Sequence, residues 1–148
     1  MAENFNVTEV QGDLFSAPPG YSLAHCISAD CRLGLGIAKI FRQKFGRIDE
    51  LQKMGTVVGG VSPLSIGPFG GKFVYNLVTK GKYFEKPTYQ SLRSSLEAMR
   101  DHASANNVKE IAMPKIGCGL DKLEWFKVEK IIKEVFGETP IQIRVYYL

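Results

Sequence analysis

Long apolar runs, paired cysteines and clusters of metal ligands are all missing from this 148-residue sequence. The longest apolar runs are far too short to span a bilayer, and no signal-peptide pattern opens the chain, so we expect no membrane association. The three cysteines, Cys26, Cys31 and Cys118, are odd in number and scattered. They predict reduced thiols in a nuclear or cytoplasmic protein. With two histidines and no Cys-x-x-Cys pair, no metal site is expected.

A strong excess of charge of one sign is also lacking, since the formal net charge is +4. Such a modest positive charge suits anionic ligands but does not by itself indicate nucleic-acid binding. The hydrophobic content of 45% is typical of a globular chain and not of a disordered one. We predict one domain over residues 1–148, large enough to bury roughly two thirds of its unfolded surface. No repeat or linker divides it.

Strand-like segments alternate with helical patterns along the whole chain. Strands are expected at 5–10, 23–27, 56–61, 73–78, 108–113 and 141–147, and helices at 37–45, 48–54, 123–136 and from Thr88 to Asn106. Residues 59–71 are rich in Gly and Pro and predict a surface loop or a long hairpin. The alternation predicts an α/β fold with a mostly parallel sheet between helices. Ligands of such folds bind beyond the carboxyl ends of the strands.

The segment from Met113 to Asp121 is the most informative part of the chain. A strand, a glycine-rich turn and a helix follow one another there, and this order makes an anion pocket from backbone N–H groups and a helix N-terminus. A second turn, Gly34-Leu35-Gly36, opens the helix expected at 37–45. Alone, it could equally be an ordinary tight turn before a helix. Together, two opposed turns predict a clamp for a diphosphate that needs no metal.

Two charged residues at strand ends are candidates for chemistry, and each has a purely structural alternative. Lys80 ends the strongly patterned strand that begins at Phe73, although a lysine in such a place is usually a solvated charge. Asp121 closes the glycine turn and could act as an acid or a base. It also lies three residues before Glu124, which fits a capping box for the last helix.

Three further residues have competing interpretations. Asp13 is either a turn or helix-capping residue, or a carboxylate that accepts a hydrogen bond from an adenine amino group. His25 lies inside an apolar strand, which favours a core histidine with a satisfied hydrogen bond over a catalytic base. His25 with Cys118 would suggest a thiol hydrolase, but no helix N-terminus and orienting acid that would activate the thiol are evident.

Several segments together resemble the macro domain family, and more narrowly its branch of ADP-ribosyl-protein glycohydrolases and O-acetyl-ADP-ribose deacetylases. The resemblance runs nearly from end to end, and the Cys-Gly-Leu-Asp turn and the Leu-Val-Thr-Lys strand end occur together at the family spacing. The segments that carry it are 10–15, 24–32, 34–38, 86–89, 95–99, 113–121 and 145–148. After Lys80, however, Gly81-Lys82-Tyr83-Phe84 replaces the more basic run that the resemblance leads us to expect.

The resemblance implies a six-stranded mixed sheet between helices, with ADP-ribose in a cleft at the strand ends. By position, Lys80 would be the nucleophile and Asp121 the acid–base partner. The other implied ligand contacts are Asp13 and Leu14 at the adenine, Ser28 along the ligand, Leu148 beside the adenosine, and two loops around the diphosphate and distal ribose, namely Gly34, Gly36, Ile37 and Ala38 with Lys115, Ile116, Gly117, Cys118, Gly119 and Leu120.

The implied activity is removal of mono-ADP-ribose from acidic side chains, deacetylation of O-acetyl-ADP-ribose, or both, without a cofactor. The expected partners are ADP-ribose and ADP-ribosylated proteins, and the expected state is a monomer. Two other activities fit the same cleft: a reader that binds ADP-ribose without turnover, and a phosphatase acting on phosphorylated ADP-ribose. A nucleic-acid binder is a weaker alternative, because basic and aromatic residues are not interleaved on one strand pair.

Overall fold

A computed structural model describes residues 6–34, 36–67 and 72–148 of the chain. Phe5 of the first expected strand, Leu35 of the second glycine turn and residues 68–71 lie outside this description. The elements are β1 (Val7–Gln11), the 3₁₀ turn η1 (Leu14–Ser16), β2 (Ser22–Ser28), α1 (Gly36–Phe45), α2 (Ile48–Met54), β3 (Val61–Ile66), β4 (Lys72–Lys80), α3 (Tyr89–Ala105), β5 (Glu110–Pro114), α4 (Trp125–Phe136) and β6 (Gln142–Tyr147).

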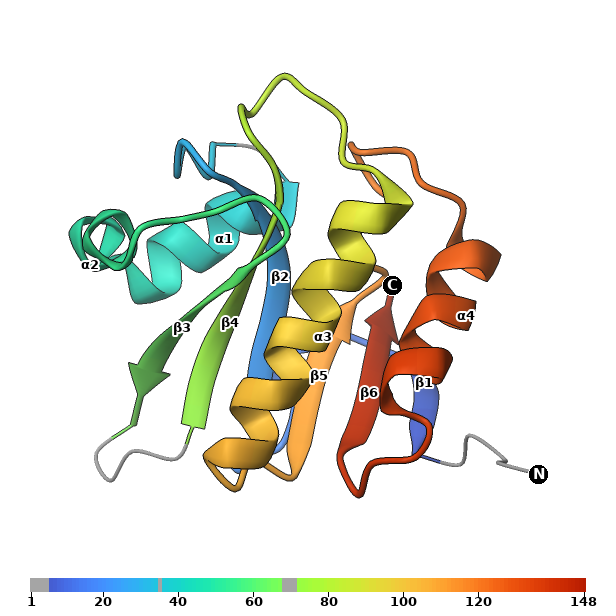
Figure 1. The fold of residues 1–148 in the computed structure, drawn as a ribbon. Coiled ribbons are helices and arrows are strands. Elements are labelled where there is room, and N and C mark those ends of the chain that lie inside the picture. Colours follow the sequence, from blue (N-terminus) through green and yellow to red (C-terminus); the bar gives the residue numbers. More distant parts are fainter. Residues whose placement is uncertain (1–5, 35, 68–71) are drawn as a thin grey trace.

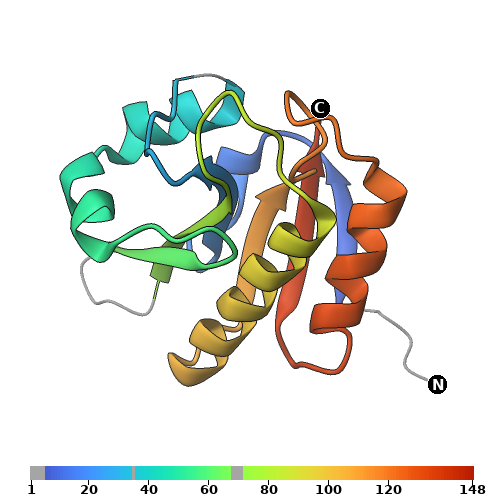
Figure 2. The same ribbon diagram turned by 45° about the horizontal axis from the view of Figure 1, so that its top comes forward.

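The strands form one six-stranded sheet in the order β1-β6-β5-β2-β4-β3 (Figure 1). Every neighbouring pair is parallel except β3 and β4, which pair antiparallel. The predicted α/β fold with a mixed, mostly parallel sheet is therefore confirmed. Because β2, β4 and β5 run in the same direction, the loops that follow them gather at one end of the sheet, where the C-terminus also lies (Figures 1 and 2).

Helices cover both faces of the sheet. The helices α3 and α4 pack side by side on one face, and α1, α2 and η1 lie on the other (Figures 1 and 2). Strand β2 serves both layers: Ala24 packs with the α3 and α4 cluster, whereas Leu23 and Ile27 pack on the opposite side. This burial on both faces explains why the strand is a nearly continuous apolar run. None of the described helices is long and apolar enough to cross a membrane.

The start of α3 is tied to the end of β4. Thr88, where the helix was expected to begin, is its N-cap: its hydroxyl accepts the Ser91 N–H at 2.9 Å, and the Ser91 hydroxyl accepts the Thr88 N–H at 3.1 Å. The Ser91 hydroxyl also donates to the Thr79 carbonyl at 2.6 Å. The helix cap therefore fixes the backbone immediately before Lys80.

The third strand lies later in the chain than the sequence pattern indicated. A strand was predicted at 56–61, but residues 61–66 form β3, and Val57 and Val58 are exposed before it. The reason is local: Gly59 has a φ of +88°, and the Gly60 N–H bonds to the Val57 carbonyl, so the chain turns there. The hairpin interpretation of residues 59–71 is confirmed by the antiparallel pairing of β3 and β4, and Pro63 is tolerated because β3 is an edge strand.

His25 is a core residue, as predicted. Its side chain is fully buried, its Nε2 lies 2.6 Å from Asn76 Oδ1 on the neighbouring strand, and its ring stacks on Phe41 at 3.8 Å. Within the described residues its Nδ1 has no hydrogen-bond partner. Burial lowers the pKa of His25 to about 4, because the charged ring would lose its hydration, although the Asn76 contact acts in the opposite direction. The ring is therefore neutral in the folded protein at neutral pH.

This buried ring predicts a pH-dependent stability. Since the folded-state pKa lies below the unfolded value of about 6.5, the unfolded chain binds a proton between pH 6.5 and 4 that the folded chain does not. The free energy of unfolding should fall by about 3 kcal/mol as the pH drops through this window. Urea unfolding of wild type and His25→Gln at a series of pH values measures the difference. Identical pH slopes for the two proteins would contradict the account.

Candidate functional site

A cleft of about 840 Å³ lies beyond the carboxyl ends of β2, β4 and β5, where the parallel sheet predicts a ligand site. Its volume is within the usual range for small-molecule sites. Most of the predicted site residues line it: Ser28, Gly34, Gly36, Ile37, Ala38, Lys80, Lys115, Ile116, Gly117, Gly119, Leu120 and Asp121. Segments from three different strand ends thus meet in one cavity.

Lys80 and Asp121 form an ion pair in this cleft. Lys80 Nζ lies 2.6 Å from Asp121 Oδ1, and the two side chains are only 15% and 16% exposed. Lys80 is therefore not the solvated charge that its position at a strand end would suggest. The capping role considered for Asp121 is wrong, because α4 begins at Trp125 with Glu124 as its N-cap residue. The strand end and the glycine turn, distant in sequence, bring together an amine and a carboxylate.

The two glycine turns approach each other across the cleft. Gly36, which opens α1, has a φ of +58°, and a Cβ there would lie 3.3 Å from Leu120 Cδ1 of the other turn. Gly117 has a φ of +73°, and a Cβ there would lie 2.8 Å from Leu123 Cδ1. Both positions therefore favour glycine for their backbone conformation, and a side chain at either would also push a leucine aside. The first N–H groups of α1 lack partners within the helix, so they are available to an anion at the helix N-terminus.

Positive charge predominates around the cleft. Among the lining residues of the described chain, the cations Arg32, Lys80, Lys86 and Lys115 outnumber the carboxylates Glu85 and Asp121. Such a balance favours an anionic ligand.

The loop after Lys80 supplies lining residues that the sequence analysis did not assign. Tyr83, Phe84, Glu85 and Lys86 line the cleft, and Arg32 stacks on the Tyr83 ring with its guanidinium carbon 4.8 Å from the ring centroid. The available signal was their position directly after the candidate nucleophile. The departure from the family pattern at residues 81–84 thus falls on the wall of the cleft.

Four predicted ligand residues do not line this cleft. Asp13 caps η1, and its carboxylate accepts the Phe15 N–H at 3.0 Å, which confirms the helix-cap alternative. Leu148 is 95% exposed at the end of the chain, and Cys118 is half-buried with its Sγ 3.3 Å from the Ile116 carbonyl. The adenine contacts assigned to Asp13 and Leu14 stay predictions.

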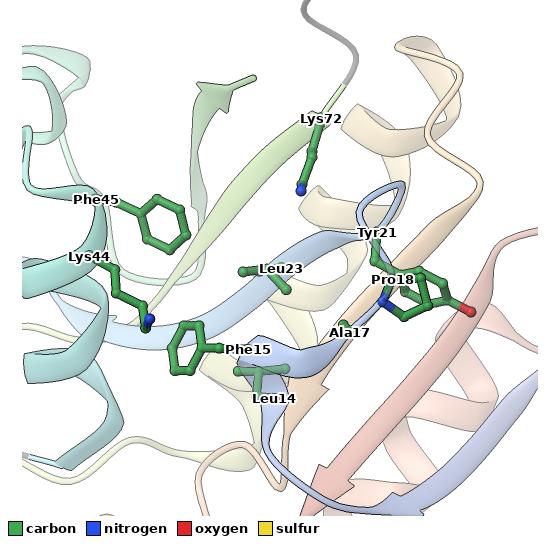
Figure 3. Close-up of a pocket in the computed structure, with 9 residues that line it drawn as sticks. All are labelled: Leu14, Phe15, Ala17, Pro18, Tyr21, Leu23, Lys44, Phe45 and Lys72. Atoms are coloured by element: carbon green, nitrogen blue, oxygen red, sulfur yellow. The ribbon is translucent and has the colours of Figure 1, made fainter. Parts of the chain in front are cut away.

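Leu14 lines a second, smaller cavity of about 330 Å³ (Figure 3). This cavity is lined by Tyr21 and Lys72, at the amino ends of β2 and β4, so it lies at the opposite end of these strands from Ser28 and Lys80. Lys44 and Phe45 close it from the end of α1. The two cavities are therefore separate.

The thiols of Cys26 and Cys118 are not activated for nucleophilic chemistry. Burial raises the pKa of Cys26 to about 12, with the nearby Asp121 carboxylate adding to the effect, and burial raises the pKa of Cys118 to about 11. Both thiols are protonated at neutral pH, and a thiolate is the reactive form. His25 bonds through Nε2 to Asn76 and stacks on Phe41, whereas Cys118 packs against the hydrophobic cluster on the other face of the sheet. A thiol hydrolase is therefore not supported, and the described residues contain no cluster of three or more potential metal ligands.

The chain is similar to known proteins over nearly its whole length. The family model described as "Macro domain" matches residues 24–132. The chain is 48% identical over 147 residues to a Bos taurus protein named ADP-ribose glycohydrolase OARD1, covering 99% of this chain and 95% of that protein. Its Homo sapiens counterpart of the same name is 48% identical over 146 residues, covering 99% and 94%.

The fold matches solved structures as well. The macrodomain of Mycobacterium tuberculosis DarG superimposes with a TM-score of 0.86 over 96% of this chain and 97% of that one, at 21% sequence identity. At this identity the likeness concerns the fold alone. The family model and the relatives that match nearly the full length show more than the fold, since they establish the family. This chain belongs to the macro domain family.

Proposed function

We propose that this protein is a hydrolase that releases mono-ADP-ribose from acidic side chains, acts on O-acetyl-ADP-ribose, or does both. The observation that carries the proposal is the contact between Lys80 and Asp121 inside a cleft at the strand ends. The name of the relatives that match nearly the whole chain, ADP-ribose glycohydrolase, supports the same activity. Asp121 and Lys80 are the proposed catalytic pair.

The cleft accounts for binding of the ADP-ribose portion. The diphosphate would lie between the two glycine turns, where backbone N–H groups, the N-terminus of α1 and the surrounding cations stabilise negative charge. The distal ribose would then lie toward Lys80 and Asp121, which follow the same strand ends. In this pose the anomeric carbon would lie beside an amine, and the acyl group would lie at the mouth of the cleft.

Lys80 would act as a nucleophile on this carbon. As the Nζ–C bond forms, the bond to the acyl oxygen breaks and the side chain of the modified protein leaves as a carboxylate. The resulting adduct opens to a Schiff base, and water resolves it to free ADP-ribose and the original amine. The enzyme is regenerated unchanged at the end of this sequence, and no oxidant or reductant is needed.

Asp121 would handle the proton in this sequence. Lys80 Nζ and the Asp121 carboxylate form an ion pair at 2.6 Å, yet only the neutral amine can attack. Asp121 therefore serves by accepting the lysine proton during attack and returning it when the adduct is hydrolysed. The short distance fulfils the geometric requirement for such a transfer.

The direct test is release of free ADP-ribose from a protein mono-ADP-ribosylated on glutamate. Lys80→Ala should abolish turnover, and Asp121→Asn should lower kcat by roughly 100-fold to 10,000-fold, the usual contribution of a positioned acid or base. Lys109→Ala is the matched control, because Lys109 is exposed just before β5 and should leave the rate unchanged.

Other outcomes point to the alternative activities. Equal release by wild type and Lys80→Ala would keep the hydrolase but remove Lys80 from its mechanism. No release by wild type, together with retained ADP-ribose binding, would indicate a reader. Release of inorganic phosphate from phosphorylated ADP-ribose that persists in Lys80→Ala would indicate a phosphatase.

Substitutions of Gly117 and Gly119, both in the 115–120 loop, should affect folding and ligand binding separately. A methyl group at Gly119 meets no protein atom within 4 Å, so Gly119→Ala should leave thermal unfolding unchanged while it weakens ADP-ribose binding by narrowing the cleft. Gly117→Ala should destabilise the fold by about 1–3 kcal/mol, because alanine is strained at a φ of +73°. Thermal scans and calorimetric titration with ADP-ribose measure both effects. Undiminished binding by Gly119→Ala would show that this loop does not contact the ligand.

A further inference from the structure

The Asp30 carboxylate joins the loop that follows β2 to the loop that follows Lys80, and residues of both line the cleft. Its Oδ1 accepts the hydroxyl of Ser28, the last residue of β2, at 2.5 Å and the Arg32 N–H of the following loop at 3.2 Å. Its Oδ2 accepts the Tyr83 N–H at 3.0 Å, from the loop that follows Lys80. Asp30 itself is absent from the residues that line the cleft, although the three groups it binds all belong to lining residues.

The backbone around Asp30 continues this link to the candidate nucleophile. The Ala29 N–H donates to the Lys80 carbonyl at 2.8 Å, and the Asp30 N–H donates to the Gly81 carbonyl at 3.2 Å. These bonds follow an irregularity in the pairing of β2 with β4, where Ser28 pairs with Lys80. The backbone of Lys80 is therefore held on one side by the loop that Asp30 organises.

The loop after β2 contains backbone conformations that need such support. Cys31 has a φ of +57° and Leu33 a φ of +41°, in the left-handed region that costs non-glycine residues about 1–3 kcal/mol each. The hydrogen bond from the Arg32 N–H to Asp30 lies between these two residues. Strain of this kind persists where surrounding contacts enforce it, and it concentrates at functional sites.

The same carboxylate orients the Ser28 hydroxyl. Ser28 is only 4% exposed, and its one hydroxyl proton is directed to Asp30, so its oxygen presents lone pairs to other groups. Partial burial raises the pKa of Asp30, but the hydrogen bonds from Ser28, Tyr83 and Arg32 outweigh this effect and hold it below the ordinary value. The carboxylate is thus ionised and acts as an acceptor at neutral pH.

We propose that Asp30 is a positioning residue for the reaction, which holds the loop after Lys80 and the Ser28 hydroxyl in the geometry needed for attack. This inference rests on the proposed hydrolase function. Asp30 acts through Tyr83, Ser28 and the Lys80 backbone, without touching the substrate. Without its second acceptor oxygen, residue 30 should no longer hold the Tyr83 N–H, and residues 81–86 should shift. The Lys80 amine would then lie slightly out of position for attack, which slows the chemical step more than it weakens ligand binding.

The test compares Asp30→Asn with wild type in ADP-ribose release from a glutamate-modified protein. Asparagine keeps the size and one acceptor oxygen, so kcat should fall roughly 10-fold to 100-fold. The affinity for free ADP-ribose should stay within about threefold, because the hydrogen bonds of the Asp30 carboxylate reach neither α1 nor the 115–120 loop. Asp49→Asn, on the exposed face of α2, is the matched control and should match wild type in rate. A purely structural role would lower melting temperature and affinity together with the rate.

A second pair of variants removes the same contact from its other partner. Tyr83→Pro lacks both the side chain and the N–H that Asp30 accepts, whereas Tyr83→Ala lacks only the side chain. A kcat for Tyr83→Pro roughly 10-fold below that of Tyr83→Ala would support the inference even if Asp30→Asn fails to fold.

Equal rates for the two Tyr83 variants, or wild-type turnover by Asp30→Asn, would overturn the positioning role and leave the hydrolase standing. A wild type that releases no ADP-ribose would overturn the hydrolase itself and this inference with it.

Discussion

The parallel pairing of β2 with β4 and with β5 is the constraint on which the site depends. It directs the carboxyl ends of three strands to one end of the sheet, where Ser28, Lys80 and the glycine turn after Pro114 meet. Because helices bury both faces of the sheet, a ligand can reach it at the ends of the strands, and the larger cleft lies at this end. The core therefore determines where a cleft can form, and the loops determine what it binds.

Within the cleft, one ion pair has to meet two opposed requirements. Lys80 and Asp121 are paired at 2.6 Å in the resting protein, while nucleophilic attack requires that the lysine lose its proton. In the proposed mechanism the same carboxylate accepts that proton, since it is close enough to do so. The surrounding cations and glycine turns would stabilise the ligand's charge without taking part in the transfer. The proposal thus assigns binding and chemistry to different residues of one cavity.

The sequence predicted those features that local pattern or family resemblance encodes. Alternating apolar segments indicated the parallel sheet, Thr88 marked the start of α3, and the resemblance pointed to Lys80 and Asp121 in a common cleft. The third strand was misplaced because the turn at Gly59 and Gly60 interrupts an apolar run that looks strand-like. The Asp30 network was not found, because it joins irregular loops 53 residues apart by contacts that have no periodicity.

The central claim is that Lys80 forms a covalent bond with the substrate, and reductive trapping tests it most directly. Incubation with glutamate-modified protein and cyanoborohydride should convert the Schiff base to a stable amine. Mass spectrometry of the digested enzyme should then find ADP-ribose on the peptide that contains Lys80. Turnover of the same substrate with no adduct, or with an adduct only on Lys115 or another lysine, would contradict the account.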